Sequence, residues 1–355
     1  MNVKINFIKR IVILIVIFLH PFLAESRDYS LYVGNYEFNS DFSLVTETRV
    51  LRVNPDTGDR SLVSSNTKGS GPLLYGIHDL IYCGSNSLYV MGTNGLAFPD
   101  TREMLYRVDL SSGNRTAVAG PFTGTTRRML LSSDGNIICI RTPAETSANN
   151  IDKIDPSTAN TSTLASASIG SGIAYSNSYD AVEESPSSII YGKSSQIARL
   201  NTITLERIAI ATFSSGSIGP MTYLPGKLLV IRSMLDQTKQ IAEIDLPSLN
   251  ISVLGPSADD LILDSQFIAH RILQAPDNII YFSSAPGMHI GGALLLAVCK
   301  IDPSTGRGSI VSGPANGSGP ILGNSEPPVV NGPIGLAIAP NVKSSAKQWT
   351  KWNTP

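Results

Sequence analysis

Short β-prone runs alternate with turn signals along the whole chain. Three segments show this most clearly, each with two apolar runs joined by a short polar connection. They are "YGIHDLIYCGSNSLYVMG" (75 to 92), "RRMLLSSDGNIICIRT" (127 to 142) and "FIAHRILQAPDNIIYFSS" (267 to 284). The connections CGSN, SSDG and APDN are typical of tight turns, so each segment predicts a pair of antiparallel strands. Long runs rich in Ala, Glu and Lys are missing, and the pattern therefore favours an all-β fold.

A second hairpin pattern occurs six times. Its best copy, "KIDPSTGRGSIVSG", has a β-prone run on each side of a polar turn. Asp302 can accept a backbone hydrogen bond two residues on, Pro303 pre-sets φ, and Gly306 can take the left-handed conformation that closes a bulged loop. The aligned positions are Asn54, Asp109, Asp155, Asn201, Asp245 and Asp302, at spacings of about 44 to 57 residues. We interpret the pattern as turn chemistry; the alternative is six acidic or amide groups that bind cations.

The two hairpins give four strands per period, which predicts a six-bladed β-propeller. Residues 29 to 35 resemble a second strand with no first strand before it, and "GPIGLAIAP" (332 to 340) resembles an inner strand with no partners after it. Their pairing would close the ring as one strand plus three and remove exposed sheet edges. A seven-bladed ring with one cryptic blade and an open solenoid are the alternatives. The expected blades are 29–65 plus 332–340, 74–120, 125–166, 170–212, 217–256 and 264–313.

The first 26 residues are typical of a signal peptide. Lys4, Lys9 and Arg10 precede a short apolar run, and the small residues Ala24 and Ser26 suit positions −3 and −1 of a signal peptidase site. The apolar run is shorter than the ~20 residues of a membrane span, so we expect a soluble, exported chain that is periplasmic, secreted or on the cell surface. An uncleaved anchor is the alternative. Residues 27–341 would form the propeller and 342–355 a tail that folds back or binds a partner.

Charge and cysteine content exclude two classes of protein. Without residues 1–26 the net charge is about −3, and no basic run exists to neutralise phosphates, so we expect no nucleic-acid partner. Only Cys83, Cys139 and Cys299 are present, an odd number with wide spacing, so disulfides do not form the framework.

The repeat resembles that of known propellers. The chain is similar to the six-bladed superfamily that includes NHL-repeat, SMP-30/gluconolactonase-like and YWTD propellers. It looks closest to uncharacterised exported bacterial proteins with "VDPxTGxRxxVS" repeats, matched here by residues 54–58 and 302–306. The lactonase-like members would imply a divalent metal in the channel, held by carboxylate and amide side chains of inner strands. The inner strands of this chain supply few carboxylates, and the YWTD motif is absent.

Any functional site is expected on one face of the ring. In a propeller, the loops that enter the inner strands and those that join strands two and three surround one mouth of the channel. The catalytic candidates there are His78, His270, Asp79 and Arg128. The ligand-binding candidates are His289, Arg127, Arg271, Asp100, Asp259, Asp260 and Asp264. Scattered histidines without a shared site are the alternative, because no spacing forces these residues together.

Glycine-rich segments also recur between blades, at 68–74, 168–174, 216–221 and 316–324. No helix is expected after them, so a phosphate-binding loop is disfavoured. Tight crossings from blade to blade would require small residues and positive φ.

These observations favour a binding or interaction propeller for a protein, small-molecule or carbohydrate ligand that the sequence does not identify. The alternative is a metal-dependent hydrolase or lactonase-like enzyme with its site at the same face. The sequence does not identify a cofactor, and a divalent metal ion is the one candidate.

Overall fold

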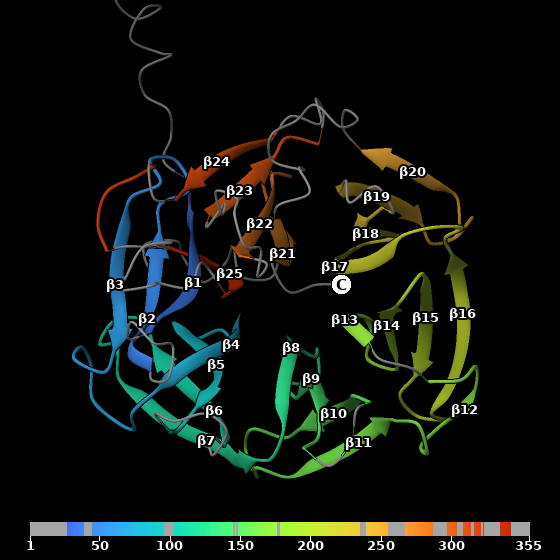
Figure 1. The fold of residues 1–355 in the computed structure, drawn as a ribbon, viewed down its shortest axis with the longest axis horizontal. Coiled ribbons are helices and arrows are strands. Elements are labelled where there is room, and N and C mark those ends of the chain that lie inside the picture. Colours follow the sequence, from blue (N-terminus) through green and yellow to red (C-terminus); the bar gives the residue numbers. More distant parts are fainter. Residues whose placement is uncertain are drawn as a thin grey trace, which may run out of the picture.

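The computed structural model confirms an all-β, six-bladed propeller (Figure 1). It describes residues 27–38, 45–95, 102–144, 146, 148–175, 178–234, 239–254, 267–286, 297–303, 308–313, 316–320, 322 and 334–341. The expected signal segment and the tail lie outside these residues. Across the described part of the chain there is no helix at all, and so none that could cross a membrane.

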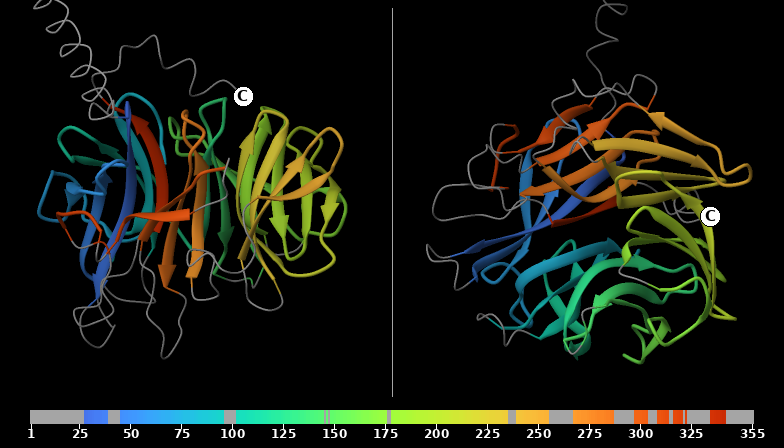
Figure 2. Two further views of the ribbon diagram at one scale, coloured as in Figure 1. Left: turned by 90° about the horizontal axis from the view of Figure 1, so that it is seen from above. Right: turned by 45° about the vertical axis from the view of Figure 1, so that its right-hand side comes forward.

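Each blade is an antiparallel sheet whose first strand lies nearest the axis of the ring. Figure 2 shows that these inner strands run roughly along that axis. Blade 1 contains β25 (Ile334–Pro340), β1 (Tyr29–Phe38), β2 (Val45–Val53) and β3 (Arg60–Ser65). Blade 2 contains β4 (Tyr75–Tyr82), β5 (Ser87–Thr93), β6 (Glu103–Asp109) and β7 (Arg115–Phe122). Blade 3 contains β8 (Thr125–Leu131), β9 (Ile137–Thr142), β10 (Asn150–Ile154) and β11 (Thr161–Ala165).

The other three blades follow the same order. Blade 4 contains β13 (Ser178–Ser185), β14 (Ser188–Lys193), β15 (Gln196–Asn201) and β16 (Glu206–Thr212), and β12 (Ser171–Gly172) adds a two-residue parallel strand at its outer edge. Blade 5 contains β17 (Ser217–Leu224), β18 (Lys227–Ser233), β19 (Lys239–Asp245) and β20 (Ile251–Leu254). Blade 6 contains β21 (Phe267–Gln274), β22 (Ile280–Pro286), β23 (Ala297–Ile301) and β24 (Gly308–Ser312).

The ring closes as the sequence predicts. Strand β25 pairs antiparallel with β1, with Leu31 opposite Ile338 and Tyr29 opposite Pro340. One buried apolar cluster lies between each pair of neighbouring blades, and Leu31, Tyr281 and Leu336 belong to the cluster between blades 6 and 1. The closing strand therefore joins the first blade and also packs against the last.

The repeated hairpin turns have the chemistry expected of them. Asn54 Oδ1 accepts hydrogen bonds from the amides of Asp56 (2.8 Å) and Thr57 (3.3 Å), and Gly58 has φ of 75°. Asp109 caps its turn in the same way. In the sixth copy, residues 304–307 lie outside the described part of the chain.

Three of the four glycine-rich segments cross between blades at the outer rim of the ring, whereas residues 216–221 lie at the start of the inner strand β17. Residues 69–71 lie against the fourth strand of blade 2. The carbonyl oxygen of Ser70 accepts a hydrogen bond from the amide of Arg115, and the amide of Ser70 donates one to Asn114 Oδ1 (2.8 Å). Gly71 has φ of 106°, and a Cβ there would collide with the carbonyl oxygen of Arg115. The expected demand for small residues and positive φ is therefore met at the rim of the ring.

An arginine holds each of these rim crossings in place. The Arg115 guanidinium donates to the carbonyl oxygens of Pro72, Ser65 and Lys68 and to Ser64 Oγ. Two other arginines, Arg60 and Arg207, make the same kind of contact with residues 313–320 and 166–173. In these three blades, the arginine six residues after the aligned Asn or Asp of the hairpin turn thus links the outer strand of one blade to the chain that leaves the preceding blade.

Candidate functional site

A β-bulge interrupts the inner strands where they line the channel. The register with the second strand skips one residue at His78, Arg127, Tyr179 and His270 in blades 2, 3, 4 and 6. A bulge re-aims the neighbouring side chains. The residues that follow these bulges are Asp79, Arg128, Asp180 and Arg271, so four charged residues occupy corresponding positions around the channel.

The two aspartates connect neighbouring blades at the axis. Asp79 is fully buried, and its Oδ2 accepts a hydrogen bond from the amide of Met129 on β8 (2.7 Å). Asp180 on β13 accepts in the same way from the amide of Met221 on β17 (2.8 Å). Burial raises the pKa of Asp180, although Arg128 and Arg271 act in the opposite direction. The two carboxylates therefore stabilise the ring through bonds to backbone amides.

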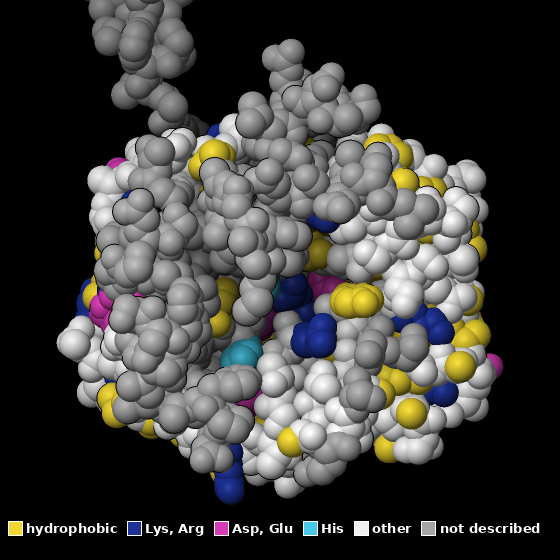
Figure 3. All heavy atoms as spheres, in the orientation of Figure 1, with side chains coloured by type: hydrophobic (Ala, Val, Ile, Leu, Met, Phe, Trp, Pro, Cys, Tyr) yellow, Lys and Arg dark blue, Asp and Glu magenta, His cyan; other side chains and the backbone are white. Residues whose placement is uncertain are grey.

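Arg271 spans the channel from blade 6. Its Nη1 donates to Asp79 Oδ2 (2.7 Å) in blade 2 and to the carbonyl oxygen of Met129 (2.6 Å) in blade 3, which lies opposite in the ring. Blade 1 leaves space for this pair, because a Cβ on Gly335 would lie 2.8 Å from Asp79 Oδ1. Figure 3 shows basic, acidic and histidine side chains gathered at the hollow in the centre of the ring. Arg271 therefore links blades 2, 3 and 6 across the channel.

Arg128 and His270 lie beside the Asp79–Arg271 pair. The Nε atom of Arg128 is buried 3.8 Å from Asp180 Oδ1 and has no hydrogen-bond partner among the described residues. Burial, and then the charge of Arg128, lower the pKa of His270 to about 3. His270 is therefore neutral at physiological pH.

His78 belongs to a different group of contacts. Its Nε2 atom lies 3.6 Å from Glu103 Oε1, and Glu103 accepts hydrogen bonds from the amide and the hydroxyl group of Thr126, both at 2.6 Å. This carboxylate therefore joins blades 2 and 3.

Among the other candidates predicted from the sequence, Arg127 is exposed. The remaining candidates, His289, Asp100, Asp259, Asp260 and Asp264, lie outside the described residues.

A cavity of about 510 Å³ lies among the later residues of the inner strands β8, β13, β17 and β21, and Arg271 lines it. Glu183 on its wall accepts hydrogen bonds from Ser132 Oγ (2.6 Å), from the amide of Ser133 (2.7 Å) and from Ser133 Oγ (3.0 Å). The cavity is lined by Leu130, Leu131, Ser132, Ser133, Gly135, Ala181, Val182, Glu183, Met221, Thr222, Tyr223, Arg271 and Leu273. Of these residues only Arg271 was a sequence candidate. The others lie in the later residues of the inner strands and in the turn that follows β8. The acidic residues of "DAVEE" in an inner strand are the one local signal for them.

The residue types that usually bind metal ions do not cluster among the described residues. No group of three or more His, Cys, Asp or Glu side chains among them could hold a metal ion. Asp79, Glu103 and Asp180 instead accept hydrogen bonds from backbone amides, a hydroxyl group and Arg271. Cys139 and Cys299 are buried free thiols.

Comparison with known proteins adds information on the fold. No family model matches the chain, and no curated protein sequence matches it. Among solved structures, the chain is similar to one in a nidogen/laminin complex, with a TM-score of 0.58, 11% identity, and coverage of 88% of this chain and 98% of that one. It is also similar to TolB from Acinetobacter baumannii, with a TM-score of 0.55, 15% identity, and coverage of 91% and 70%. A protein of unknown function from Bacteroides caccae gives a TM-score of 0.54, 12% identity, and coverage of 88% and 99%. At these identities the similarity extends to the propeller fold alone.

Proposed function

We propose that this chain is an exported binding propeller that holds a small ligand in its central channel. The observation that carries the proposal is the cavity of about 510 Å³ between blades 3, 4, 5 and 6. Its size is within the range of small-molecule sites, about 300–1,000 Å³. Export rests on the signal-like sequence of residues 1–26.

The lining of the cavity suggests the chemistry of the ligand. Leu131, Val182 and Leu273 offer apolar contacts, while Thr222 and Arg271 offer hydrogen bonds. A site of this kind buries an apolar body and orients it through a few polar groups. The proposed ligand is therefore a small amphipathic molecule with its polar end toward Arg271.

The carboxylates of the channel support binding over catalysis. General acid–base chemistry needs a group that can exchange a proton with a substrate. Asp79 and Asp180 instead hold backbone amides of the next blade. The metal-dependent hydrolase or lactonase alternative rests on the contact between His78 and Glu103. Ligand binding by the loop-face candidates stays a prediction.

A fluorescence titration with anilinonaphthalene sulfonate, an amphipathic probe, tests the proposal. We expect saturable binding at one site, weakened about tenfold or more, roughly 1.4 kcal/mol, by Val182→Trp, which fills the cavity. Ile203→Trp is the matched control, because Ile203 is 79% exposed on a turn of the same blade. Circular dichroism of both variants checks that the fold is kept.

Equal binding by Val182→Trp and the unchanged protein would contradict the proposed site. A panel of esters and lactones, tested with and without a chelator, addresses the alternative. Chelator-sensitive turnover that is lost in His78→Ala would replace the binding function with the enzymatic one.

A further inference from the structure

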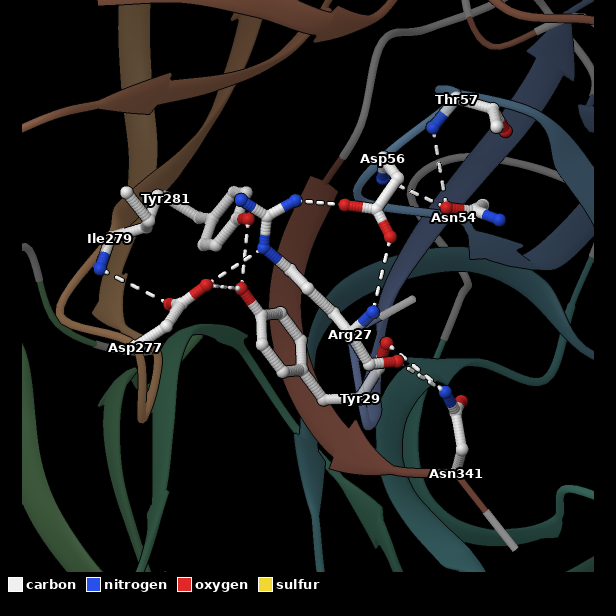
Figure 4. Close-up of polar contacts among 9 residues, drawn as sticks. All are labelled: Arg27, Tyr29, Asn54, Asp56, Thr57, Asp277, Ile279, Tyr281 and Asn341. Carbon is white, nitrogen blue, oxygen red and sulfur yellow. Dashed lines mark hydrogen bonds and ion pairs between the residues drawn. The ribbon is translucent and has the colours of Figure 1, made fainter. Parts of the chain in front are cut away.

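The residue that follows the signal-like segment connects the first and last blades. The Arg27 guanidinium forms ion pairs with Asp56, in the turn between β2 and β3, and with Asp277, in the turn between β21 and β22. Its Nε atom lies 2.7 Å from Asp277 Oδ2. Figure 4 shows the side chain of Arg27 between these two carboxylates. Arg27 therefore bridges the two blades that meet where the ring closes.

The backbone nitrogen of Arg27 also points at a carboxylate. This nitrogen lies 3.2 Å from Asp56 Oδ2 (Figure 4). The main chain is fixed directly after it, because Asn341 Nδ2 donates to the carbonyl oxygen of Arg27 (2.8 Å) and the amide of Asn341 donates to the carbonyl oxygen of Asp28 (2.7 Å). The position of the nitrogen atom is therefore set by the closing strand.

The charges in this cluster are not balanced by side chains alone. Arg27 supplies one positive charge to Asp56 and Asp277. Burial alone would raise the pKa of Asp277, but hydrogen bonds from Arg27 and from Tyr29 hold it below its ordinary value, so this carboxylate is ionised at neutral pH. The nearby Arg52 and Arg60 donate instead to Ser30, to Asn341 and to residues 312–320. Among Arg27, Asp56 and Asp277 themselves, one further positive charge at the nitrogen of Arg27 would balance the two carboxylates.

Space for such a charged group lies next to the cluster. A cavity of about 390 Å³ is lined by Arg27, Asp56 and Asn341, among other residues. The sequence before Arg27 ends in Ala24-Glu25-Ser26, with small residues at the positions that a signal peptidase reads. The geometry and the sequence therefore mark the same peptide bond.

Building on the proposed export of the chain, we propose that a signal peptidase cuts between Ser26 and Arg27, and that the released α-ammonium group pairs with Asp56 and stabilises the closed ring. Water supplies the hydroxyl group that adds to the carbonyl carbon of Ser26, which becomes a carboxylate. The nitrogen of Arg27 becomes an amine and takes up a proton at neutral pH, since the ordinary pKa of an α-amino group is about 8. An amide hydrogen bond to Asp56 thus becomes a charged one, which is stronger.

Two readouts test the proposal. The first is N-terminal sequencing of the exported protein, for which we expect Arg27 as the first residue. The second is urea unfolding of a chain that starts at Arg27 with a free amine, compared with a chain that carries Gly-Ser before Arg27. We expect the free amine to raise the folding equilibrium constant about two- to fivefold, the range for a partly exposed ion pair. This difference should disappear in Asp56→Asn.

A matched variant separates the ion pair from general destabilisation. Asp277→Asn removes the other partner of Arg27 and should lower the stability of both chains while it keeps the difference between them. Cleavage at another bond would overturn the proposal. So would a Gly-Ser extension that lowers the stability of the unchanged protein and of Asp56→Asn by the same amount. None of these measurements involves the channel or its ligand.

Discussion

Replacement of Arg115 by methionine will destabilise the junction between blades 1 and 2. Arg115 is only 4% exposed, and its guanidinium group holds four acceptors: Pro72 O (2.8 Å), Ser64 Oγ (2.8 Å), Ser65 O (2.5 Å) and Lys68 O (3.1 Å). Methionine keeps most of the volume but donates no hydrogen bond.

The expected loss is about 3 kcal/mol. A buried acceptor that loses its partner costs about 1–3 kcal/mol. The hydroxyl group of Ser64 keeps the hydrogen bond that it donates to the carbonyl oxygen of Gly113 (2.6 Å), and water can reach the outer carbonyl groups. We therefore count about two unsatisfied carbonyl oxygens among the four acceptors. Urea unfolding would measure the change, and hydrogen exchange of residues 64–73 would place it at this crossing.

Ile251→Met is the matched control. Ile251 begins β20 at the corresponding position of blade 5, where no arginine is present, and it is 42% exposed. An exposed substitution of this kind changes stability by about 0.5 kcal/mol or less. A loss in Arg115→Met no greater than in Ile251→Met would refute the view that these arginines hold the blade crossings.

Three further predictions concern the ring and the channel. Gly71→Ala should destabilise more than Gly135→Ala, because only Gly71 has a carbonyl oxygen in the way; equal melting temperatures would contradict this. Asp79→Asn should cost about 3–5 kcal/mol by urea unfolding, because Arg271 loses its charged partner; a loss below about 1 kcal/mol would make the pair unimportant. His270 has a pKa of about 3, below its unfolded value near 6.5, so stability present above pH 6.5 is lost as pH falls toward 3, by at most about 1.4 kcal/mol per pH unit. His270→Gln should flatten this part of the profile, and an unchanged slope would show that another group titrates there.

The architecture could be predicted from the sequence because it depends on local patterns. The "DPSTG" type of turn fixes each hairpin through hydrogen bonds within five residues, and six copies count the blades. The lone inner strand at 332–340 corresponds to β25 (Ile334–Pro340). Closure followed because an unpaired strand at each end leaves only one arrangement without open edges.

The contacts within the channel could not be predicted in this way. Asp79 and Arg271 are 192 positions apart, and only the closed ring brings them together. The sequence marked both as polar residues of inner strands, but it could not show that they pair with each other. The arginines Arg115 and Arg207 were visible too, yet their acceptors lie in the chain that leaves the preceding blade, and no local rule identifies them.

The cavity was missed for a related reason. Val182 and Leu273 read as ordinary apolar residues of buried strands, and only the meeting of four blades leaves space between them. The sequence predicted a site in the loops that enter the inner strands and join strands two and three, and the acidic candidates Asp100 and Asp259 lie outside the described residues.

The most direct test of the central claim is a crystallographic fragment soak of the mature protein with a library of small amphipathic compounds. We predict that bound fragments gather in the cavity between β8, β13, β17 and β21, with apolar groups against Val182 and polar atoms toward Arg271. Fragments bound only elsewhere on the molecule, with this cavity holding none, would contradict the account.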